Sequence, residues 1–389
     1  MPSSNANKRI TIIGTGLIGG SLGMALKAAG LPGLEIVGHD RSHGVAGQAE
    51  KAGAIDRAEH NMPRAVSGAG MVVIAVPILS VREVMQEIAA SLKEGAVVTD
   101  TTSTKAYVMG WAKETLPEHV NFVGGHPMAG KENAGIENAE AGLFQGKAYC
   151  VCPAVDASDA AVKSVLGLAR LAGSDPIFMD AEEHDIYAAA VSHLPLVIST
   201  ALFSMLRSSP AWTDLGMMAS SGFRDVTRLA SGDPAMSHGI WVTNREAVIH
   251  WLERMTNELG RFRDMLKDAQ DEALLETFFK AQADREVFLR EPPKRREEAA
   301  VANVDSNQAL MSMLVGGMMA KQIQRGKELS EPKREDAQLE GKEEQKRRPS
   351  FGDKVAEGVR RDLEKLEQGR AQKQSSASEQ DSSDDEKKT

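Results

Sequence analysis

Residues 9–19 read RITIIGTGLIG, and they join an apolar strand pattern to a glycine-rich turn and the start of a helix. Gly14 permits the tight turn, Gly16 lets the backbone approach a pyrophosphate, and Gly19 allows close packing of the helix. The helix N-terminus then offers amide donors and a positive dipole to phosphates. The stretch predicts a dinucleotide-binding unit, whose cofactor contacts are Gly14, Gly16, Leu17, Ile18 and Gly19.

An acidic residue follows the glycine-rich turn at the spacing expected of a carboxylate that binds the adenosine ribose. The second apolar run, Glu35 to His39, ends at Asp40, where a carboxylate can accept hydrogen bonds from both adenosine ribose hydroxyls. Its charge would repel the 2′-phosphate of NADP, so we expect NAD as the cofactor. The neighbouring Arg41 could hold that phosphate if it turned inward, which leaves dual use open. A glycine-rich turn beside a surface aspartate is the alternative.

Short apolar runs alternate with helical patterns from Lys8 to about Asp180. The runs are Arg9–Ile13, Glu35–His39, Met71–Val76, Ala96–Thr99, Val120–Val123, Ala148–Val151 and Ile177–Met179. This alternation is typical of a largely parallel sheet covered by helices on both faces. We therefore expect an α/β fold, with a Rossmann-type dinucleotide-binding domain over residues 1–180.

The pattern becomes helical from about Ala181 to Arg290, with long stretches at Tyr187–Leu206 and Arg245–Leu266. It predicts an all-helical domain over residues 181–290 for substrate binding and dimerisation, with Pro195 kinking or breaking its first helix. Residues 291–389 are rich in charge, Gln and Ser, which predicts a largely disordered extension. Within it, residues 309–320 are apolar and Met-rich, as a packed helix or a docking helix would be; any partner of this tail is unknown.

Composition excludes several classes of function. The chain has 389 residues, a 42% hydrophobic content and a net charge of −9, so it can form two cores but lacks the positive field of a nucleic-acid-binding protein. Cys150 and Cys152 have no metal-ligand spacing and are interpreted as reduced core residues. We find no run of about 18 consecutive apolar residues, so we expect no membrane span and a cytoplasmic protein.

Two loops are expected at the carboxyl edge of the sheet, where ligands bind in such folds. Val76-Pro77 ends the third apolar run, and Asp100-Thr101-Thr102-Ser103 ends the fourth. We expect them to flank the nicotinamide, with Val76, Pro77 and Thr101 in contact with the cofactor. Pro77 taken alone could equally be a strand terminator.

One imidazole is expected at the same edge. His126 lies in Gly124-Gly125-His126-Pro127-Met128-Ala129-Gly130, which follows the run Val120–Val123 on a glycine-flanked loop. A neutral imidazole can accept the proton of a hydroxyl while the carbon that bears it loses a hydride. Taken alone, His126 could also be a structural loop histidine.

From about Lys8 to Arg290 the chain resembles the prephenate and arogenate dehydrogenase family. The motifs that carry the resemblance are Gly14–Gly19, Asp100–Lys105, Gly124–Gly130, Ser192-His193-Leu194-Pro195 and Ser221–Arg228. The resemblance implies an NAD-dependent enzyme of tyrosine biosynthesis that oxidises and decarboxylates prephenate to 4-hydroxyphenylpyruvate without a metal. It also implies that His126 hydrogen-bonds the ring hydroxyl, that Ser103 helps to orient it, and that Arg228 binds a substrate carboxylate.

Two further residues are candidates for the substrate site. His193 could bind substrate or satisfy a buried backbone carbonyl, and Glu132 could line or gate the site or simply be solvated. Some family members have a second histidine directly after Pro195, where this chain has Leu196. Arogenate is therefore an alternative substrate, whose ammonium Asp225 or Glu132 could pair with.

Other readings stay open at this point. One alternative is another two-domain NAD(P) dehydrogenase of the 3-hydroxyacid type, and another is a non-catalytic NAD-binding protein that works through its tail. The resemblance implies a homodimer, and apolar helix positions such as Met217, Met218 and Trp241 would permit one, although they could equally be core. We recognise no regulatory domain after the helical part, so we expect that feedback by tyrosine, if it occurs, would act at the active site.

Overall fold

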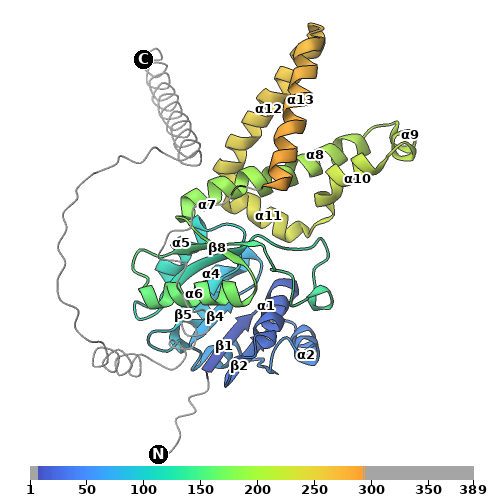
Figure 1. The fold of residues 1–389 in the computed structure, drawn as a ribbon. Coiled ribbons are helices and arrows are strands. Elements are labelled where there is room, and N and C mark those ends of the chain that lie inside the picture. Colours follow the sequence, from blue (N-terminus) through green and yellow to red (C-terminus); the bar gives the residue numbers. More distant parts are fainter. Residues whose placement is uncertain (1–7, 292, 294–389) are drawn as a thin grey trace, which may run out of the picture. The chain divides into compact units, whose positions relative to one another are not determined.

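The structure, a computed structural model, describes residues 8–291 and residue 293. Its eight-stranded sheet has the order β3-β2-β1-β4-β5-β6-β7-β8 (Figure 1). The strands are β1 (Lys8–Ile13), β2 (Leu34–His39), β3 (Arg57–Ala58), β4 (Met71–Ile74), β5 (Val97–Asp100), β6 (Asn121–Pro127), β7 (Ala148–Pro153) and β8 (Asp175–Phe178). All neighbours pair in parallel except β6 and β7, so the predicted largely parallel sheet is confirmed.

Helices cover both faces of this sheet because successive side chains of each strand point to opposite sides. Ile12 joins the core beneath α1 and α6, whereas Ile13 joins the core beneath α4 and α5. The helices and helical turns of this part are α1 (Leu17–Ala28), α2 (His43–Lys51), α3 (Met62–Val66), η1 (Ile78–Ser80), α4 (Val81–Ile88), η2 (Ala89–Ser91), α5 (Ala106–Thr115), η3 (Ile136–Asn138) and α6 (Asp159–Leu171). The strand order reverses between β1 and β4, which places the ligand crevice at their carboxyl ends.

Strand β6 is longer than the sequence predicted, because it continues through His126 to Pro127. Its second half pairs antiparallel with β7, with His126 opposite Cys150, and this pairing keeps the glycine-rich stretch extended. A Cβ atom on Gly125 would lie 2.6 Å from the Asp100 carbonyl oxygen, so the glycine is required by close packing. The expectation that His126 lies on a loop was therefore wrong.

Beyond Asp180 the described chain is helical. Its elements are α7 (Ala181–Ala188), the π-helical turn η4 (Ala189–His193), α8 (Leu194–Arg207), α9 (Trp212–Met217), α10 (Ser221–Thr227), η5 (Arg228–Ser231), α11 (Pro234–Thr243), α12 (Arg245–Lys267) and α13 (Asp271–Arg290). The helices α12 and α13 lie side by side (Figure 1). The division into domains at residue 180 stays a prediction, and nearly all of the predicted tail, with its apolar segment 309–320, lies outside the described residues.

Pro195 does not break its helix. It lies at the start of α8, directly after the wide π-helical turn of η4, and this turn accommodates a residue without a backbone N–H inside a continuous helix. Residues Ala181–Arg207 thus form one 27-residue helical run, long and apolar enough by length and composition to cross a membrane. This run does not consist of consecutive apolar residues, because small polar side chains such as Ser192 and Ser199 interrupt it. Such a helix also occurs as an ordinary helix of a globular protein, so it is weak evidence for a membrane.

Candidate active site

The ends of four neighbouring strands bring the predicted cofactor and catalytic residues to one edge of the sheet. Ile13 is in register with Ile74, and Ile74 is in register with Asp100, so the loops after β1, β4 and β5 begin at the same level. The backbone N–H of Gly125 on β6 donates to the Asp100 carboxylate at 3.1 Å, which brings the neighbouring His126 to this edge as well.

The glycine-rich turn fits a bound pyrophosphate. Gly14 has a φ of +90°, and a Cβ there would lie 2.4 Å from the carbonyl oxygen of Ala75. A Cβ on Gly19 would lie 1.9 Å from the Gly14 carbonyl oxygen, whereas one on Gly16 would meet nothing within 4 Å. Because no side chain caps α1, its first N–H groups are available to an anion. The backbone therefore requires glycine at positions 14 and 19, whereas the contacts of this turn with a cofactor stay predictions.

Leu17 and Ile18 contribute to this turn through their backbone. The side chain of Leu17 is buried in the core beneath α1, and Ile18 packs against the same core. Both residues lie in the first turn of α1, so their N–H groups are among those that a phosphate can use.

Asp40 directly follows β2 and faces the glycine-rich turn. Its Oδ2 accepts a hydrogen bond from the Thr15 backbone N–H at 2.9 Å, and its Oδ1 accepts one from the Ser42 N–H at 3.0 Å. Arg41 next to it is exposed. The carboxylate is therefore tied to the turn that would hold the pyrophosphate, where a ribose beside that group would meet it.

A buried ion pair organises the loop after β5. Lys105 Nζ and the Asp100 carboxylate are in contact, and both side chains are fully buried. The same carboxylate accepts from the backbone N–H of Thr102 at 2.9 Å. These contacts fix the loop that contains Thr101 and Ser103, although the sequence reading gave neither Asp100 nor Lys105 a role.

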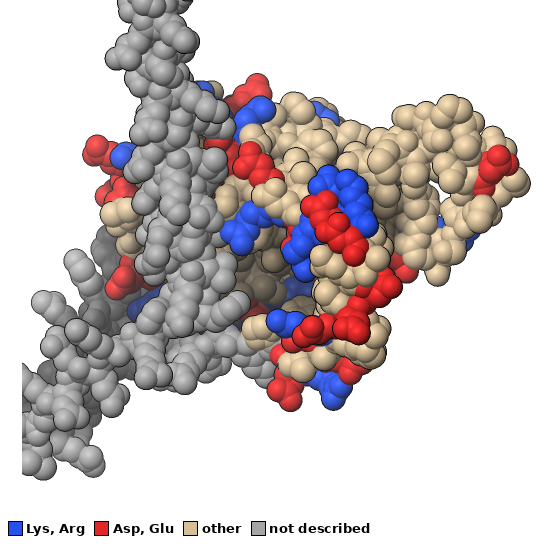
Figure 2. Space-filling model, turned by 90° about the horizontal axis from the view of Figure 1, so that it is seen from above, with Lys and Arg blue, Asp and Glu red and all other residues tan. Residues whose placement is uncertain are grey.

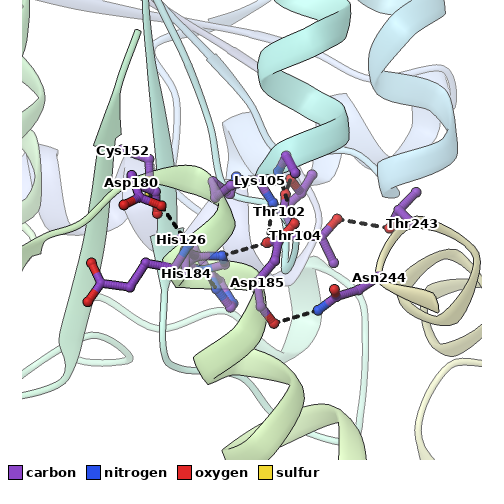
Figure 3. Close-up of polar contacts among 12 residues, drawn as sticks. Thr102, Thr104, Lys105, His126, Cys152, Asp180, His184, Asp185, Thr243 and Asn244 are labelled. Atoms are coloured by element: carbon purple, nitrogen blue, oxygen red, sulfur yellow. Dashed lines mark hydrogen bonds and ion pairs between the residues drawn. The ribbon is translucent and has the colours of Figure 1, made fainter. Parts of the chain in front are cut away.

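His126 contacts a second imidazole that the sequence reading missed. Its Nδ1 lies 2.8 Å from Nε2 of His184 on α7, and the two rings meet edge to face with centroids 5.1 Å apart (Figure 3). Burial lowers the pKa of His126 well below its usual value, and the nearby His184, Lys105 and His193 lower this pKa further. His126 is therefore neutral near pH 7, so one of its ring nitrogens has a lone pair that can accept a hydrogen bond.

The chain of contacts continues from His184 to Asp185. Nδ1 of His184 lies 2.8 Å from Oδ1 of Asp185, and this carboxylate accepts hydrogen bonds from the backbone N–H groups of Lys105 at 2.6 Å and Ala106 at 2.9 Å. Asp185 thereby caps α5, which has no capping side chain of its own. The only sequence signal was local: His184 and Asp185 follow the helix-capping Asp180 and precede the SHLP motif.

His193 is fully buried beside this network. Asn244 Nδ2 lies 3.1 Å from His193 Nδ1 and donates to the Asp185 carbonyl oxygen at 2.7 Å. Within the described part of the chain, His193 Nε2 is a buried atom without a hydrogen-bond partner. Burial, the largest influence, lowers the pKa of His193 to about 4 even though Asp185 opposes the shift.

Arg228 and Glu132 are brought together in an ion pair. Arg228, the first residue of η5, forms an ion pair with Glu132, which follows the β6 motif. The Arg228 side chain is 60% exposed, so its guanidinium is accessible from solvent. No contact between described residues joins this pair to His126, and Ser103 likewise makes no described side-chain contact with that ring. The roles expected of Arg228, Glu132 and Ser103 therefore stay predictions.

The remaining predicted cofactor residues lie just after the ends of β4 and β5. Val76 is half-buried and Pro77 exposed beyond β4, and Thr101 is half-buried after β5. Among the described residues, no group of three or more His, Cys, Asp or Glu side chains is arranged to hold a metal ion. Cys150 and Cys152 are both buried thiols, as expected of reduced core residues.

Comparisons with known proteins match this architecture. The family model of the prephenate dehydrogenase nucleotide-binding domain matches residues 22–175, and that of the prephenate dehydrogenase dimerization domain matches residues 180–280. Prephenate dehydrogenase of Bacillus subtilis is 32% identical over 271 residues, which are 69% of this chain and 73% of the relative. Cyclohexadienyl dehydrogenase of Zymomonas mobilis is 31% identical over 280 residues, which are 72% and 95% of the two chains.

Two solved structures are similar to the described fold. Prephenate dehydrogenase of Aquifex aeolicus in complex with hydroxyphenyl propionate and NAD+ has a TM-score of 0.67 and 29% identity, covering 71% of this chain and 96% of that one. Arogenate dehydrogenase of Synechocystis has a TM-score of 0.62 and 25% identity, covering 72% and 99%.

Proposed function

The chain belongs to the prephenate dehydrogenase family, and from this premise we propose that it oxidises and decarboxylates prephenate to 4-hydroxyphenylpyruvate with NAD, in tyrosine biosynthesis. The observation that carries the proposal is the neutral, buried imidazole of His126 at the carboxyl edge, beside a turn built for a pyrophosphate. Family membership excludes the 3-hydroxyacid-type dehydrogenase and the non-catalytic binding protein as readings of this site.

The reaction balances with one hydrogen-bond acceptor. A hydride leaves the ring carbon that bears the hydroxyl, the ring carboxylate departs as CO2, and the electron pair of the broken carbon–carbon bond completes the aromatic ring. When NAD is bound, its nicotinamide supplies the hydride acceptor. Positive charge develops on the hydroxyl group as the hydride leaves, and His126 stabilises it by accepting that hydroxyl's hydrogen bond. The proton remains on the product phenol.

The cofactor is held by the residues of the sheet edge. The open space at Gly16 and the uncapped start of α1 suit the pyrophosphate, and Asp40 suits a ribose with free hydroxyls. We assign Val76, Pro77 and Thr101 to the nicotinamide side of the crevice, because they follow β4 and β5. Arg41 is exposed next to Asp40, so use of NADP as a second cofactor is a subsidiary proposal.

Arg228 is assigned to a substrate carboxylate. Its guanidinium can bind a carboxylate through two parallel hydrogen bonds, as it does with other carboxylates. The ion pair with Glu132 shows that a carboxylate can reach this guanidinium, and a substrate would have to replace Glu132 or share the charge with it. His193, a buried histidine near the Ser103 backbone, is the second candidate for a polar substrate contact.

Arogenate is the second candidate substrate. Leu196, which follows Pro195, is buried and offers no polar contact to the keto side chain of prephenate. Asp225 is exposed and Glu132 is half-buried, so either carboxylate could pair with the ammonium of arogenate. The Synechocystis relative named above is an arogenate dehydrogenase.

The helical part supports a homodimer. Large apolar side chains stand exposed on its helices, and only 22% of the most apolar window of the α7–α8 run is buried in one chain. Met217 and Met218 are 76% and 83% exposed, so they are not core residues of one chain. On the face of the molecule that Figure 2 shows, the arm that contains α8, α9 and α10 presents few charged side chains. A second copy covering these helices would explain their apolar surface without a membrane, and we propose a cytoplasmic enzyme accordingly.

The test is steady-state turnover of purified protein with NAD and either prephenate or arogenate, followed by the absorbance of reduced nicotinamide. The proposal expects turnover of at least one substrate and loss of most of the rate in His126→Ala. The ratio of the two values of kcat/KM then names the substrate. If the protein binds NAD but oxidises neither compound, the proposed function is wrong.

A further inference from the structure

We propose that His184 and Asp185 are positioning residues that fix the tautomer of His126, so that His126 Nε2 is always a hydrogen-bond acceptor. This inference rests on the proposed function, in which His126 accepts a hydrogen bond from the substrate hydroxyl. It assigns a role to two buried residues of α7 that the reaction itself does not use.

The direction of the first hydrogen bond follows from the surroundings of Asp185. Its two carboxylate oxygens accept the backbone N–H groups of Lys105 and Ala106, which can only donate. At the N-terminus of α5, these donors and the helix dipole also favour a negative charge. The contact of Oδ1 with His184 Nδ1, at 2.8 Å, is therefore one in which the imidazole donates.

The second hydrogen bond follows from the first. A neutral imidazole that carries its proton on Nδ1 has a lone pair on Nε2. Nε2 of His184 must then accept the hydrogen bond from His126 Nδ1, 2.8 Å away. His126 in turn carries its proton on Nδ1, so its Nε2 has the lone pair. Within the described residues His126 Nε2 has no partner, and a substrate hydroxyl can supply the missing donor.

Burial limits the two rings to these hydrogen-bond partners. His184 is 1% exposed and His126 is 7% exposed, so water cannot readily replace the lost partner of either ring. If His184 took up a second proton, its Nε2 would become a donor and His126 would have to carry its own proton on Nε2. That proton would turn the required acceptor into a donor and oppose the substrate hydroxyl.

Other charged groups face the pair from several elements. Lys105 precedes α5 and lies close enough to lower the pKa of His126, as does His193 of η4. Lys105 is neutralised by Asp100 at the end of β5. Because the two rings share one hydrogen bond, an acid limb in the rate belongs to the pair and to these neighbours together.

Two substitutions at His184 separate positioning from packing. His184→Leu fills the space but cannot accept from His126 Nδ1, so we expect kcat to fall about 10²-fold while KM for substrate changes little. In His184→Gln the amide oxygen can accept from His126 Nδ1, so this variant should recover much of the lost kcat. His119→Leu is the control, because His119 is an exposed histidine outside the network, whose ring has its one described hydrogen bond to the Leu92 carbonyl oxygen, at 3.4 Å.

Nitrogen-15 NMR of histidine-labelled protein reads the tautomer directly and needs no substrate. The proposal expects the His126 Nδ1–H form in the wild type and a mixed or reversed form in His184→Leu. It is overturned if folded His184→Leu, checked by thermal unfolding and NAD binding, keeps the wild-type kcat, pH profile and His126 tautomer. If the wild type turns over neither substrate but shows the expected tautomers, the proposed function is wrong, whereas the proposal that His184 and Asp185 fix the tautomer of His126 stands.

Discussion

The ammonium of Lys105 and the carboxylate of Asp100 form an ion pair in which neither side chain has any exposed surface. The pair joins the end of β5 to the start of α5, and through Gly125 it also touches β6. It therefore lies behind the sheet edge where the predicted nicotinamide loop and His126 meet. A charge buried so completely is costly to leave alone.

We predict that Lys105→Met lowers the free energy of unfolding by about 3–5 kcal/mol, because it leaves the Asp100 carboxylate buried without its cation. Urea unfolding at pH 7.5 measures the change. Arg82→Met is the control, since Arg82 and Glu114 form an ion pair of 2.9 Å whose side chains are 53% and 55% exposed. That control should lose less than about 1 kcal/mol. Equal losses in the two variants would show that burial of the Lys105 pair has no special importance.

A second prediction concerns Arg228. Replacing its planar fork in Arg228→Lys should raise KM for the substrate about 10- to 100-fold, because a lysine cannot make the same pair of parallel hydrogen bonds. The KM for NAD should not change. Steady-state kinetics with each ligand varied in turn measure both constants.

Arg224→Lys is the matched control, because Arg224 is an exposed arginine on the adjacent helix α10. If Arg224→Lys raises the substrate KM as much as Arg228→Lys does, the carboxylate site does not depend on Arg228. Glu132→Gln breaks the observed ion pair and leaves the guanidinium free, so it should not weaken substrate binding as the loss of Arg228 does.

The dependence of stability on pH gives a third prediction. Burial lowers the pKa of His193 to about 4 and that of His126 well below its usual value, so the folded state disfavours the protonated rings. Below about pH 6.5 the unfolded chain takes up protons that the folded chain refuses, and stability falls as the pH falls. The contribution of His193 should reach about 3 kcal/mol at pH 4.

Urea unfolding between pH 7.5 and pH 5 tests this dependence. His193→Asn removes the titrating ring and can keep a hydrogen bond to Asn244, so its stability should fall less steeply over this range than that of the wild type. His126 continues to titrate in the variant, so some slope should remain. Identical slopes in the two proteins would contradict the low pKa of His193.

These predictions differ in how far the sequence could anticipate them. The turn at Gly14 and the position of Asp40 follow from a local motif, whose partners lie within one strand–helix–strand unit. The π-helical turn before Pro195 and the extension of β6 through His126 were not foreseen. The extension depends on pairing with β7, and the residues of β6 alone do not indicate which strand will pair with it.

The histidine network was harder still to anticipate. His126 and His184 are 58 residues apart, and they meet because α7 packs against β7, the strand that pairs with the end of β6. Neither residue's neighbours in sequence reveal that packing. A motif can therefore identify the acceptor, whereas the three-dimensional fold is needed to find what orients it.

The fourth prediction concerns the choice of cofactor. Asp40→Asn keeps the size of the side chain but removes the charge that would both bind the ribose hydroxyls of NAD and repel the 2′-phosphate of NADP. We expect KM for NAD to rise about 10- to 100-fold, as hydrogen bonds to a charged group of about 1.5–3 kcal/mol are weakened, and KM for NADP to fall. Steady-state rates with each cofactor at saturating substrate measure both constants.

The role of Arg41 determines how a fall in the KM for NADP in Asp40→Asn is interpreted. If Arg41 turns inward and holds the phosphate, Asp40→Asn with Arg41→Ala should lose the gained use of NADP while the weakened use of NAD stays the same. If the double variant keeps NADP activity, Arg41 does not bind the phosphate and repulsion by Asp40 alone accounts for the preference. An unchanged ratio of NAD to NADP use in Asp40→Asn would instead show that Asp40 serves only the Thr15 and Ser42 N–H groups that it binds in this structure.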